Sequence, residues 1–394
     1  MSGRVYLFYL GMREIILSII CATILVGTTS CDKDIDTVKY TTLSCKTVGF
    51  TYGNEKGTAW WNEDEQIYVY RGEDWWPALM SITSTKPNST SASFGGKIAG
   101  TERGYYALRP AKAALTYPHN GEMSLRVEPT NIFFAGENSS TVAPQVASGE
   151  SSKLTFSTIF GALRFDVNSP KPLTLVETCV PNREHGLYGT FEYNFRLKSL
   201  FEDDVYYKVS RRGISSTDTQ TQGEVYVAMP AGEYSSVELM VRDNSGEQRL
   251  LIAKDVVIKR GNISLAECEI STLSSVVGSW HIKSFCGTAA PVELYLSLNR
   301  DNTFIILQRI DSNGYSRYDG TYELDTTTST ISGVYSDGES WSSSYKYSLN
   351  SDLDLVLESC AESSEVTVYE PMDMPEVSAL QSLSSTSTTS VKPL

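Results

Sequence analysis

The sequence predicts an all-β protein of several domains, and three observations point to this class. From residue 38 to about residue 370, short segments such as 66–70, 163–167 and 237–241 alternate apolar and polar residues with a period of two. Turn-forming Gly, Asn, Asp, Ser and Pro residues bound these segments, as at residues 243–246. No long amphipathic helical pattern interrupts them, and the 23 Tyr residues suit half-buried pleated surfaces.

The chain of 394 residues divides into three predicted β domains. Their boundaries are placed at residues 38–152, 153–272 and 276–372, and the first break follows the hydrophilic stretch 149–152. Residues 373–394 are rich in Ser and Thr and poor in large apolar residues. They are predicted to form a disordered tail.

The composition argues against a nucleic-acid partner. The chain has 33 Lys and Arg against 47 Asp and Glu, a formal charge of −14, whereas phosphate backbones are held by clustered basic residues. Its three histidines, His119, His185 and His281, also leave little material for a histidine base or a histidine-rich metal site.

Motifs that carry chemistry are missing from the sequence. It has no phosphate-binding glycine-rich loop, no HExxH zinc helix and no Gly-x-Ser-x-Gly nucleophile elbow. The acid clusters at residues 63–65 and 202–204 supply neighbouring carboxylates, but adjacent acids on a turn are typical of solvated surface. The sequence therefore predicts a protein that is not an enzyme, with no cofactor and no metal site.

The beginning of the chain has the order of a bacterial lipoprotein signal. Residues 15–27 carry no charge and are too few to span a bilayer, which needs about 20 residues, but they suit a signal-peptide core. Small residues and then Cys31 follow. Residues 1–30 are therefore predicted to be a signal peptide, with the native start at Met12, and Cys31 to be lipidated. The alternative is an ordinary thiol after cleavage elsewhere.

Acids follow the cysteine directly. Asp32, Asp34 and Asp36 lie in the predicted linker 31–37, which resembles the acidic export tag of surface lipoproteins in Gram-negative anaerobes. The resemblance implies a lipid-anchored protein of the outer membrane that is exposed at the cell surface. Its partner there is outer-membrane lipid, reached through the acyl chains on Cys31.

Five cysteines remain in the mature body, and their odd number and low density argue against a disulfide-stapled fold. A Cys286–Cys360 disulfide inside the last domain is one interpretation, but the favoured prediction is that all five cysteines are buried thiols. They are Cys45, Cys179, Cys268, Cys286 and Cys360.

Two adjacent tryptophan pairs flank one predicted strand. They are Trp60-Trp61 and Trp75-Trp76. Because neighbouring residues of a strand point to opposite faces, one member of each pair can enter the core while the other stands outside. Exposed indoles form a platform for a sugar face or a partner protein. The favoured alternative is that loops cover them.

A run of motifs between residues 38 and 272 resembles, in its order, the fimbrillin-like surface lipoproteins. The resemblance implies two β-sandwich domains in tandem, anchored in the outer membrane through Cys31. The motifs are WWNEDEQIYVY at 60–70, GYYALRP at 104–110, APQVA at 143–147, LTFSTIFGALRF at 154–165 and AMPAGEY at 228–234.

The third domain resembles the small lipocalin-like domains of secreted bacterial proteins. Gly278-Ser279-Trp280 matches the Gly-x-Trp that opens a lipocalin's first strand, and hairpin-spaced turns follow at 301–304, 318–322 and 334–338. The resemblance implies an up-and-down β-barrel in which Trp280 plugs the floor and Gly278 permits a tight backbone approach. A barrel of this length can be too filled to hold a ligand.

Two short patterns look like O-glycosylation acceptors of the same bacterial group. They place candidate acceptor hydroxyls on Thr37 and Thr326.

The leading functional expectation is a non-enzymatic surface lipoprotein, either a fimbrial tip or anchor or an adhesin-type component. Its partners would be other fimbrial subunits, a host protein or a glycan. A stalk role is disfavoured, because no Arg lies between Cys31 and Arg71 where the resemblance implies a maturation cleavage. The alternative is a cell-surface module that binds glycans or small hydrophobic ligands through the tryptophan pairs or the C-terminal barrel.

Overall fold

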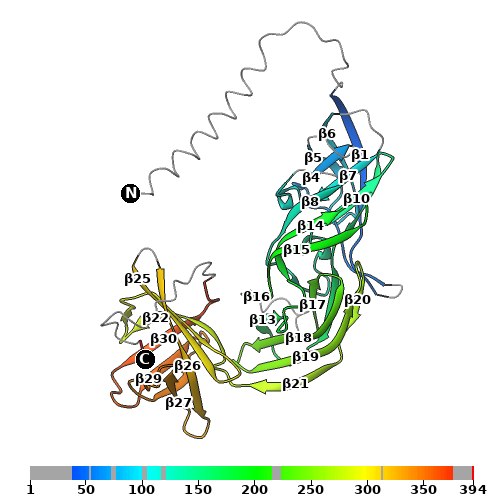
Figure 1. Cartoon of the computed structure of the whole chain (residues 1–394). Helices are drawn as coiled ribbons and strands as arrows, with labels where there is room; N and C mark the ends of the chain where they lie inside the picture. The colour runs from blue at the N-terminus through cyan, green and yellow to red at the C-terminus, as the bar shows by residue number, and fades with distance from the viewer. Residues whose placement is uncertain are drawn as a thin grey trace, which may run out of the picture.

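The structure is a computed structural model, and it is built almost entirely of β-strands (Figure 1). Besides strands, the described residues hold only two short 3₁₀ helices, η1 (Ala111–Ala113) and η2 (Ser139–Thr141). The predicted all-β class is therefore confirmed. The structure describes residues 38–52, 55–71, 77–99, 104–116, 121–214, 223–311, 314–375 and 393–394.

The first unit is a closed barrel of mixed strands. The antiparallel pair β1–β6 closes the ring, and β1 pairs in parallel with β11 on its other side. The strands in ring order are β1 (Lys39–Thr47), β11 (Lys153–Thr158), β10 (Gln145–Gly149), β7 (Tyr105–Arg109), β4 (Gln66–Arg71), β5 (Ala78–Thr85) and β6 (Ser91–Ile98). A small hairpin of β2 (Thr51–Tyr52) and β3 (Glu55–Lys56) follows β1.

This ring differs from the predicted first domain in two respects. The resemblance implied a β-sandwich, but the strand pairing in this unit runs all the way round. In addition, β11 begins at Lys153, beyond the predicted boundary at residue 152, and still belongs to this ring. The alternation of apolar residues identifies a strand's buried face but not its pairing partner, so the sequence pattern could not place β11.

The second unit is a sandwich of two sheets. Apolar side chains of both sheets meet in one buried cluster that includes Phe165, Val227, Val176 and Leu239. One sheet has the order β20 (Ile263–Leu265), β12 (Gly161–Asp166), β17 (Glu224–Met229), β9 (Ile132–Phe134). The other has the order β16 (Lys208–Arg212), β13 (Leu173–Cys179), β18 (Gly232–Asp243), β19 (Gln248–Ile258), β21 (Cys268–Leu273).

A three-stranded sheet joins the first two units. It has the order β15 (Ser199–Tyr206), β14 (Tyr188–Asn194), β8 (Glu122–Val127), so a strand of the predicted first domain pairs with strands of the second. Its inner residues, such as Leu125 and Phe191, share a buried cluster with Leu108 of the first ring and Ala162 of the sandwich. The continuous apolar contact makes the junction part of the core.

The third unit is an up-and-down barrel closed by the β22–β30 pair, in the strand order that the Gly-x-Trp resemblance implied. Its buried cluster is aromatic and aliphatic, with Trp280, Phe304, Tyr322 and Tyr369 among its members. The strands are β22 (Gly278–Phe285), β23 (Thr288–Ala289), β24 (Leu294–Leu298), β25 (Thr303–Asp311), β26 (Gly314–Asp325), β27 (Thr330–Tyr335), β28 (Tyr345–Leu349), β29 (Leu355–Ser359) and β30 (Val366–Pro371).

The tail departs from the prediction of disorder at both of its described ends. Asp373 Oδ1 accepts a hydrogen bond from Arg212 Nη2 at 2.8 Å, and its Oδ2 accepts one from Ser210 Oγ at 2.6 Å. Leu394 is 5% exposed and belongs to the buried cluster of the barrel. Residues 376–392 lie outside the described residues.

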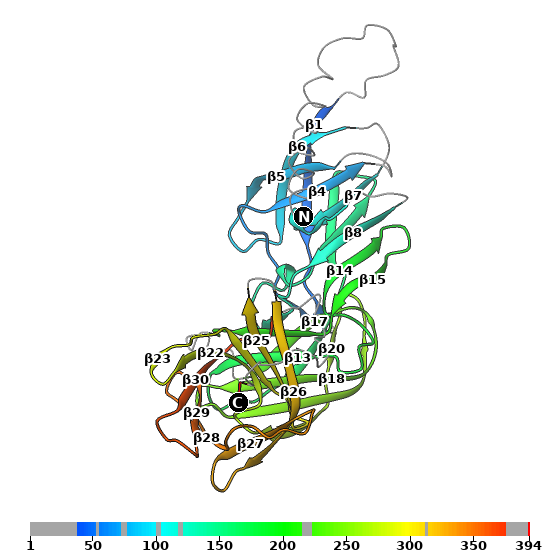
Figure 2. The ribbon, with the colours of Figure 1, turned by 60° about the vertical axis from the view of Figure 1, so that its left-hand side comes forward.

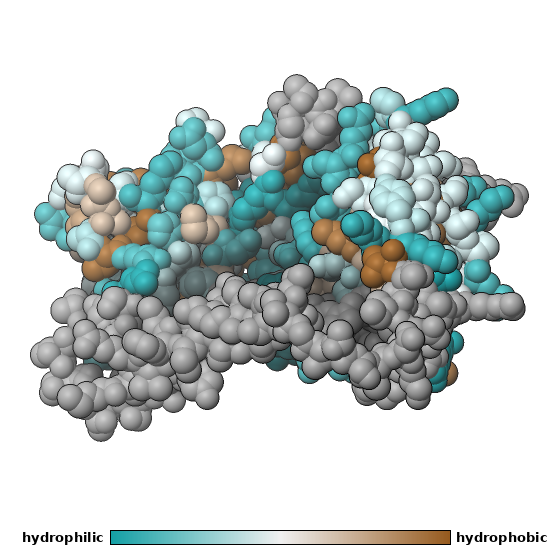
Figure 3. Space-filling model, turned by 90° about the horizontal axis from the view of Figure 1, so that it is seen from above, coloured by the Kyte–Doolittle hydropathy of each residue, from teal (hydrophilic) through white to brown (hydrophobic). Residues whose placement is uncertain are grey.

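The three units follow one another along the molecule. The C-terminal barrel lies beside the end of the sandwich that is farther from the first ring (Figures 1 and 2). Seen from above, the described surface is a mixture of hydrophilic residues and small separate hydrophobic patches (Figure 3).

Candidate functional site

Trp60 and Trp61 point into different environments, as expected for neighbours near the start of a strand. Trp61 is 1% exposed and packs edge-to-face on Phe94 and Phe156, with ring centroids 4.9 and 5.3 Å apart. Its Nε1 donates a hydrogen bond to the carbonyl of Thr90 at 3.1 Å. Trp61 is therefore a core residue, whereas Trp60 is half-buried.

A buried arginine connects this core to the loop that carries both tryptophans. Arg109 is 1% exposed, and its Cζ lies 4.0 Å from the centroid of the Trp61 ring. Its Nη2 donates to Glu65 Oε2 at 2.7 Å, and its Nε also pairs with Glu65. Its Nη1 donates to Thr47 Oγ1 at 2.7 Å. A buried charge persists only when it is paired and hydrogen-bonded, and these contacts meet that requirement.

Glu65 therefore differs from the expectation for the acid cluster 63–65. Glu63 and Asp64 are exposed, but the side chain of Glu65 is only 10% exposed because it neutralises Arg109. The other cluster does lie on the surface, on the exposed edge strand β15. There, Glu202 contacts the ring of His185 at 2.8 Å, and charges on an edge strand discourage further strand pairing.

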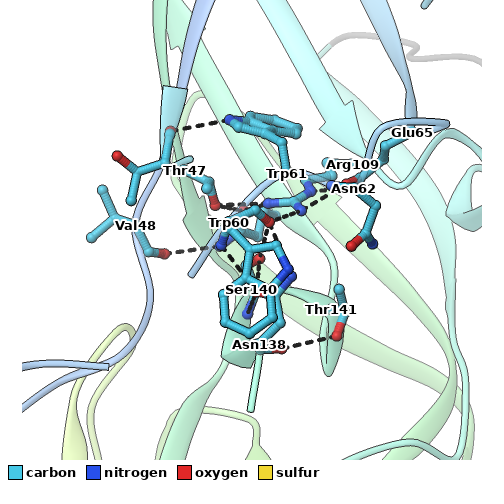
Figure 4. Close-up of polar contacts among 12 residues, drawn as sticks. Thr47, Val48, Trp60, Trp61, Asn62, Glu65, Arg109, Asn138, Ser140 and Thr141 are labelled. Carbon is cyan, nitrogen blue, oxygen red and sulfur yellow. Dashed lines mark hydrogen bonds and ion pairs between the residues drawn. The ribbon is translucent and has the colours of Figure 1, made fainter. Parts of the chain in front are cut away.

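The backbone of Trp60 is held by four hydrogen bonds (Figure 4). Its carbonyl accepts from Arg109 Nη2 at 2.8 Å, Asn138 Nδ2 at 3.0 Å and Ser140 Oγ at 3.2 Å. Its N–H donates to Asn138 Oδ1 at 3.1 Å. Asn138 also caps the short helix η2, which fixes its own position. The indole of Trp60 therefore projects from an immobilised main chain.

Trp60 lines a groove of about 810 Å³ between the first unit and the sandwich. A volume in this range is typical of ligand sites, which measure about 300–1,000 Å³. The apolar part of the lining includes Trp60, Pro110, Pro129, Ile132, Val142 and Pro144, and the polar part includes Lys112, Arg126, Glu128, Glu137, Asn138, Ser210 and Arg211.

A bidentate ion pair forms the wall on the sandwich side. Arg211 Nη1 and Nη2 donate to the two carboxylate oxygens of Glu137 at 2.7 and 2.6 Å. Burial opposes ionisation of Glu137, but the hydrogen bonds and charge of Arg211 and the N–H of Phe134 outweigh it and hold the pKa of Glu137 below its usual range. The groove thus presents a fixed carboxylate and guanidinium to whatever enters it.

Apolar faces and fixed hydrogen-bonding groups converge on this groove, a combination that can orient a ligand. Nowhere in the described part of the chain do three or more His, Cys, Asp or Glu side chains come together as a metal site. The described residues also include no helix of the length and apolarity needed to cross a membrane.

Several predicted positions lie outside the described residues. They are the signal peptide, Cys31, Thr37, Trp75 and Trp76. Thr326, the other candidate acceptor, is exposed in the turn between β26 and β27. The carboxylate of Asp325 accepts hydrogen bonds from the N–H groups of Thr327 and Thr328, which fixes that turn.

Gly278 and Trp280 lie at the junction of the sandwich and the barrel. Gly278 has φ +145°, and an added Cβ would come within 3.3 Å of Arg242 Nη2, so both conformation and space favour glycine. Trp280 is fully buried, and its Nε1 donates to the carbonyl of Val276 at 2.9 Å.

The Cys286–Cys360 disulfide is not formed in the structure, where both thiols are free and exposed. Cys286 follows β22 and Cys360 follows β29, and β30 lies between these two strands. Two strand spacings amount to roughly 9–10 Å, more than the approximately 4.4–6.8 Å between Cα atoms of a disulfide. Cys45 is buried as expected, while Cys179 and Cys268 are half-buried.

The sequence singled out Trp60 but not the residues that immobilise it. Arg109, Asn138 and Ser140 come from segments distant from Trp60, and of these only Arg109 lies in a motif quoted above, GYYALRP at 104–110. The one available signal was Arg109-Pro110 at the end of an apolar strand, since an arginine is fully buried almost only where it is paired.

Comparisons with known proteins add little. No family model matches this sequence, and no curated protein matches it. One solved structure, from Parabacteroides distasonis, bears the description "putative cell adhesion protein". It is 11% identical with a TM-score of 0.30, and the alignment covers 59% of this chain and 95% of that one. A likeness this weak carries no argument about function.

Proposed function

We propose that this protein is a non-enzymatic, surface-anchored lipoprotein of adhesin type, and that it binds its target through the Trp60 groove. The observation that carries the proposal is the half-buried indole of Trp60, held on a main chain with four hydrogen bonds at the wall of a groove of about 810 Å³. A preordered aromatic loses little conformational freedom on binding, so its contact area contributes more fully to affinity.

A glycan is the class of target that the lining favours. An indole face packs on the C–H face of a sugar ring, and side chains with several donors and acceptors suit hydroxyl groups. Glu137, Arg211 and Asn138 supply such groups around Trp60. These are the features that support the glycan reading, in which lipid attachment at Cys31 presents the groove at the outer-membrane surface.

The absence of an Arg between Cys31 and Arg71, where cleavage would free β1, favours a stand-alone adhesin or tip over a polymerising stalk subunit. β1 already has a partner on each side, β6 and β11, so the ring offers no vacant position for a neighbour's strand. Strand addition between chains would need β1 to leave first.

Binding of the full chain to immobilised neutral and sialylated oligosaccharides tests the proposal. We expect Trp60→Ala to weaken binding by at least about tenfold, the range of a truncated aromatic hot spot. Trp60→Phe should retain part of the binding, and Ile270→Ala, at a residue 58% exposed on β21, should have no effect. Unchanged binding by folded W60A would refute the role of the groove.

Attachment is tested separately in the native host. The wild-type chain should take up labelled palmitate and fractionate with outer membranes, and Cys31→Ser should do neither. Membrane association of C31S equal to that of the wild type would contradict the anchor.

A further inference from the structure

The interior of the C-terminal barrel holds a residue that belongs to none of its strands. Leu394 is 5% exposed and is a member of the buried cluster that includes Phe304, Tyr335 and Trp341. In both ribbon views the C mark lies within the outline of the barrel (Figures 1 and 2). An aliphatic side chain from outside the barrel wall thus completes its core.

The hydroxyl of Tyr335 forms hydrogen bonds with both backbone groups of Leu394. Leu394 N donates to Tyr335 Oη at 3.1 Å, and Tyr335 Oη donates to the Leu394 carbonyl at 3.1 Å. Buried backbone groups need such partners, and here the barrel supplies them from a side chain at the end of β27. The contact therefore recognises a peptide group as well as an apolar side chain.

The surroundings of Leu394 are aromatic and include buried polar groups that have no hydrogen-bond partner. Phe304 packs against Tyr335 and Trp341, with ring centroids 5.4 and 5.1 Å apart. Among the described residues, the buried Nε1 of Trp341 and hydroxyl of Tyr318 have no hydrogen-bond partner. Buried donors of this kind are uncommon and call for an explanation, which a longer peptide with further carbonyl groups would provide.

We propose that the barrel interior is a peptide-binding site for a leucine-type residue, and that Leu394 of the same chain fills it as an exchangeable plug. A residue tethered to the same chain is present at a high effective concentration, on the order of millimolar. A peptide offered in trans must therefore displace it before binding.

A labelled five-residue peptide with the sequence of residues 390–394 is the probe, titrated into the full chain. We expect Leu394→Asp to bind this peptide at least about tenfold more tightly than the wild type, because the competing plug no longer seats. Leu394→Met, which keeps an apolar side chain, should behave like the wild type. Equal affinity of wild type and L394D, or no binding to L394D with intact near-UV circular dichroism, overturns the proposal.

A measurement on the wild type covers the case in which L394D does not fold. The methyl resonances of Leu394, identified by their loss in Leu394→Ala, should be displaced by the aromatic rings and should move toward random-coil positions when excess peptide is added. Tyr335→Phe should shift the Leu394 methyl resonances toward random-coil positions even without peptide, because the seated residue loses both hydrogen bonds to that hydroxyl. Wild-type methyl resonances already at random-coil positions, or insensitive to the peptide, would also overturn the proposal.

Discussion

The guanidinium of Arg242, in the sandwich, lies over the indole ring of Trp280, in the barrel, with Cζ 4.8 Å from the ring centroid. Arg242 is 2% exposed, and its burial, together with the nearby charge of Arg212, lowers its pKa to about 10. Beside it, Gln248 Nε2 donates to the carbonyls of Ser275 and Val277 at 2.8 and 2.9 Å. These contacts of Arg242 and Gln248 fix the chain where the sandwich passes into the C-terminal barrel.

Replacing Arg242 should weaken that junction. We expect Arg242→Ala to lower the free energy of unfolding by about 2 kcal/mol, the scale of a desolvated cation–π contact. Calorimetry should show the melting of the barrel separating from that of the sandwich. Arg300→Ala is the control, because Arg300 pairs with Glu238 at the same junction but is 39% exposed, and exposed pairs contribute less than about 1 kcal/mol. A cost in R242A no larger than in R300A would contradict this role.

Arg109 should be among the most sensitive residues of the first unit. Arg109→Ala leaves Glu65 buried without its partner, and breaking a buried pair costs about 3–5 kcal/mol. Chemical unfolding with guanidinium chloride measures the loss. Arg109→Met combined with Glu65→Gln should recover much of it, since no uncompensated charge remains. Arg126→Ala, at a side chain 64% exposed, should change stability by less than about 0.5 kcal/mol, and a similar value for R109A would refute the prediction.

The Glu137–Arg211 pair predicts a pH-dependent contribution to stability. Because the pKa of Glu137 is lower in the folded state, ionised Glu137 stabilises the fold. The contribution is complete above the unfolded-state value of about 4.3 and is lost as the pH falls through the lower folded-state pKa. Urea unfolding of the wild type and Glu137→Gln should therefore differ at pH 7, and the difference should shrink as the pH falls below about 4.3.

Glu128→Gln serves as the comparison for that experiment, because the Glu128 side chain is 53% exposed and its contact with Arg126 is long, at 3.7 Å. It should differ little from the wild type across the same pH range. A constant gap between wild type and E137Q across the acid range would mean that the ion pair does not stabilise the fold.

Thiol reactivity should divide the cysteines into two groups. Burial raises the pKa of Cys45 to about 12 and is the main cause that raises those of Cys179 and Cys268 to about 11, so little thiolate forms at pH 8. Cys286 and Cys360 are exposed. Alkylation followed by peptide mass spectrometry should modify these two first and the other three only on unfolding.

The same alkylation experiment tests whether Cys286 and Cys360 form a disulfide in solution. If Cys286 and Cys360 resist alkylation until a reductant is added, they form a disulfide and the separation inferred from β30 does not hold in solution.

Sequence patterning predicted the strands, and the Gly-x-Trp resemblance predicted the C-terminal barrel, but neither predicted the long-range strand pairings or the closed ring of the first unit. Strands such as β4 and β24 were visible because alternation reports which face is buried. The pairing of β8 with β14, and of β11 with β1, joins segments whose patterns are equally compatible with other neighbours.

The candidate site, too, was predicted from the sequence only in part. Trp60 was visible as one of a pair, but its half-buried state depends on Asn138 and Arg109, which approach from loops and strands far along the chain. Leu394 lay in a segment with the composition of a disordered tail, and its seat depends on the hydroxyl of Tyr335. Contacts of this kind follow from tertiary geometry, on which local composition carries no information.

The parallel pairing of β1 with β11 has a mechanical consequence. Ser44 through Thr47 lie opposite Lys153 through Phe156, and the two strands run in the same direction. A pull between the start of β1, on the side of the proposed anchor, and the chain leaving β11 would slide the strands lengthwise. All their hydrogen bonds would then carry the load together instead of opening one by one, which makes this strand pair a shear clamp against tension at the cell surface.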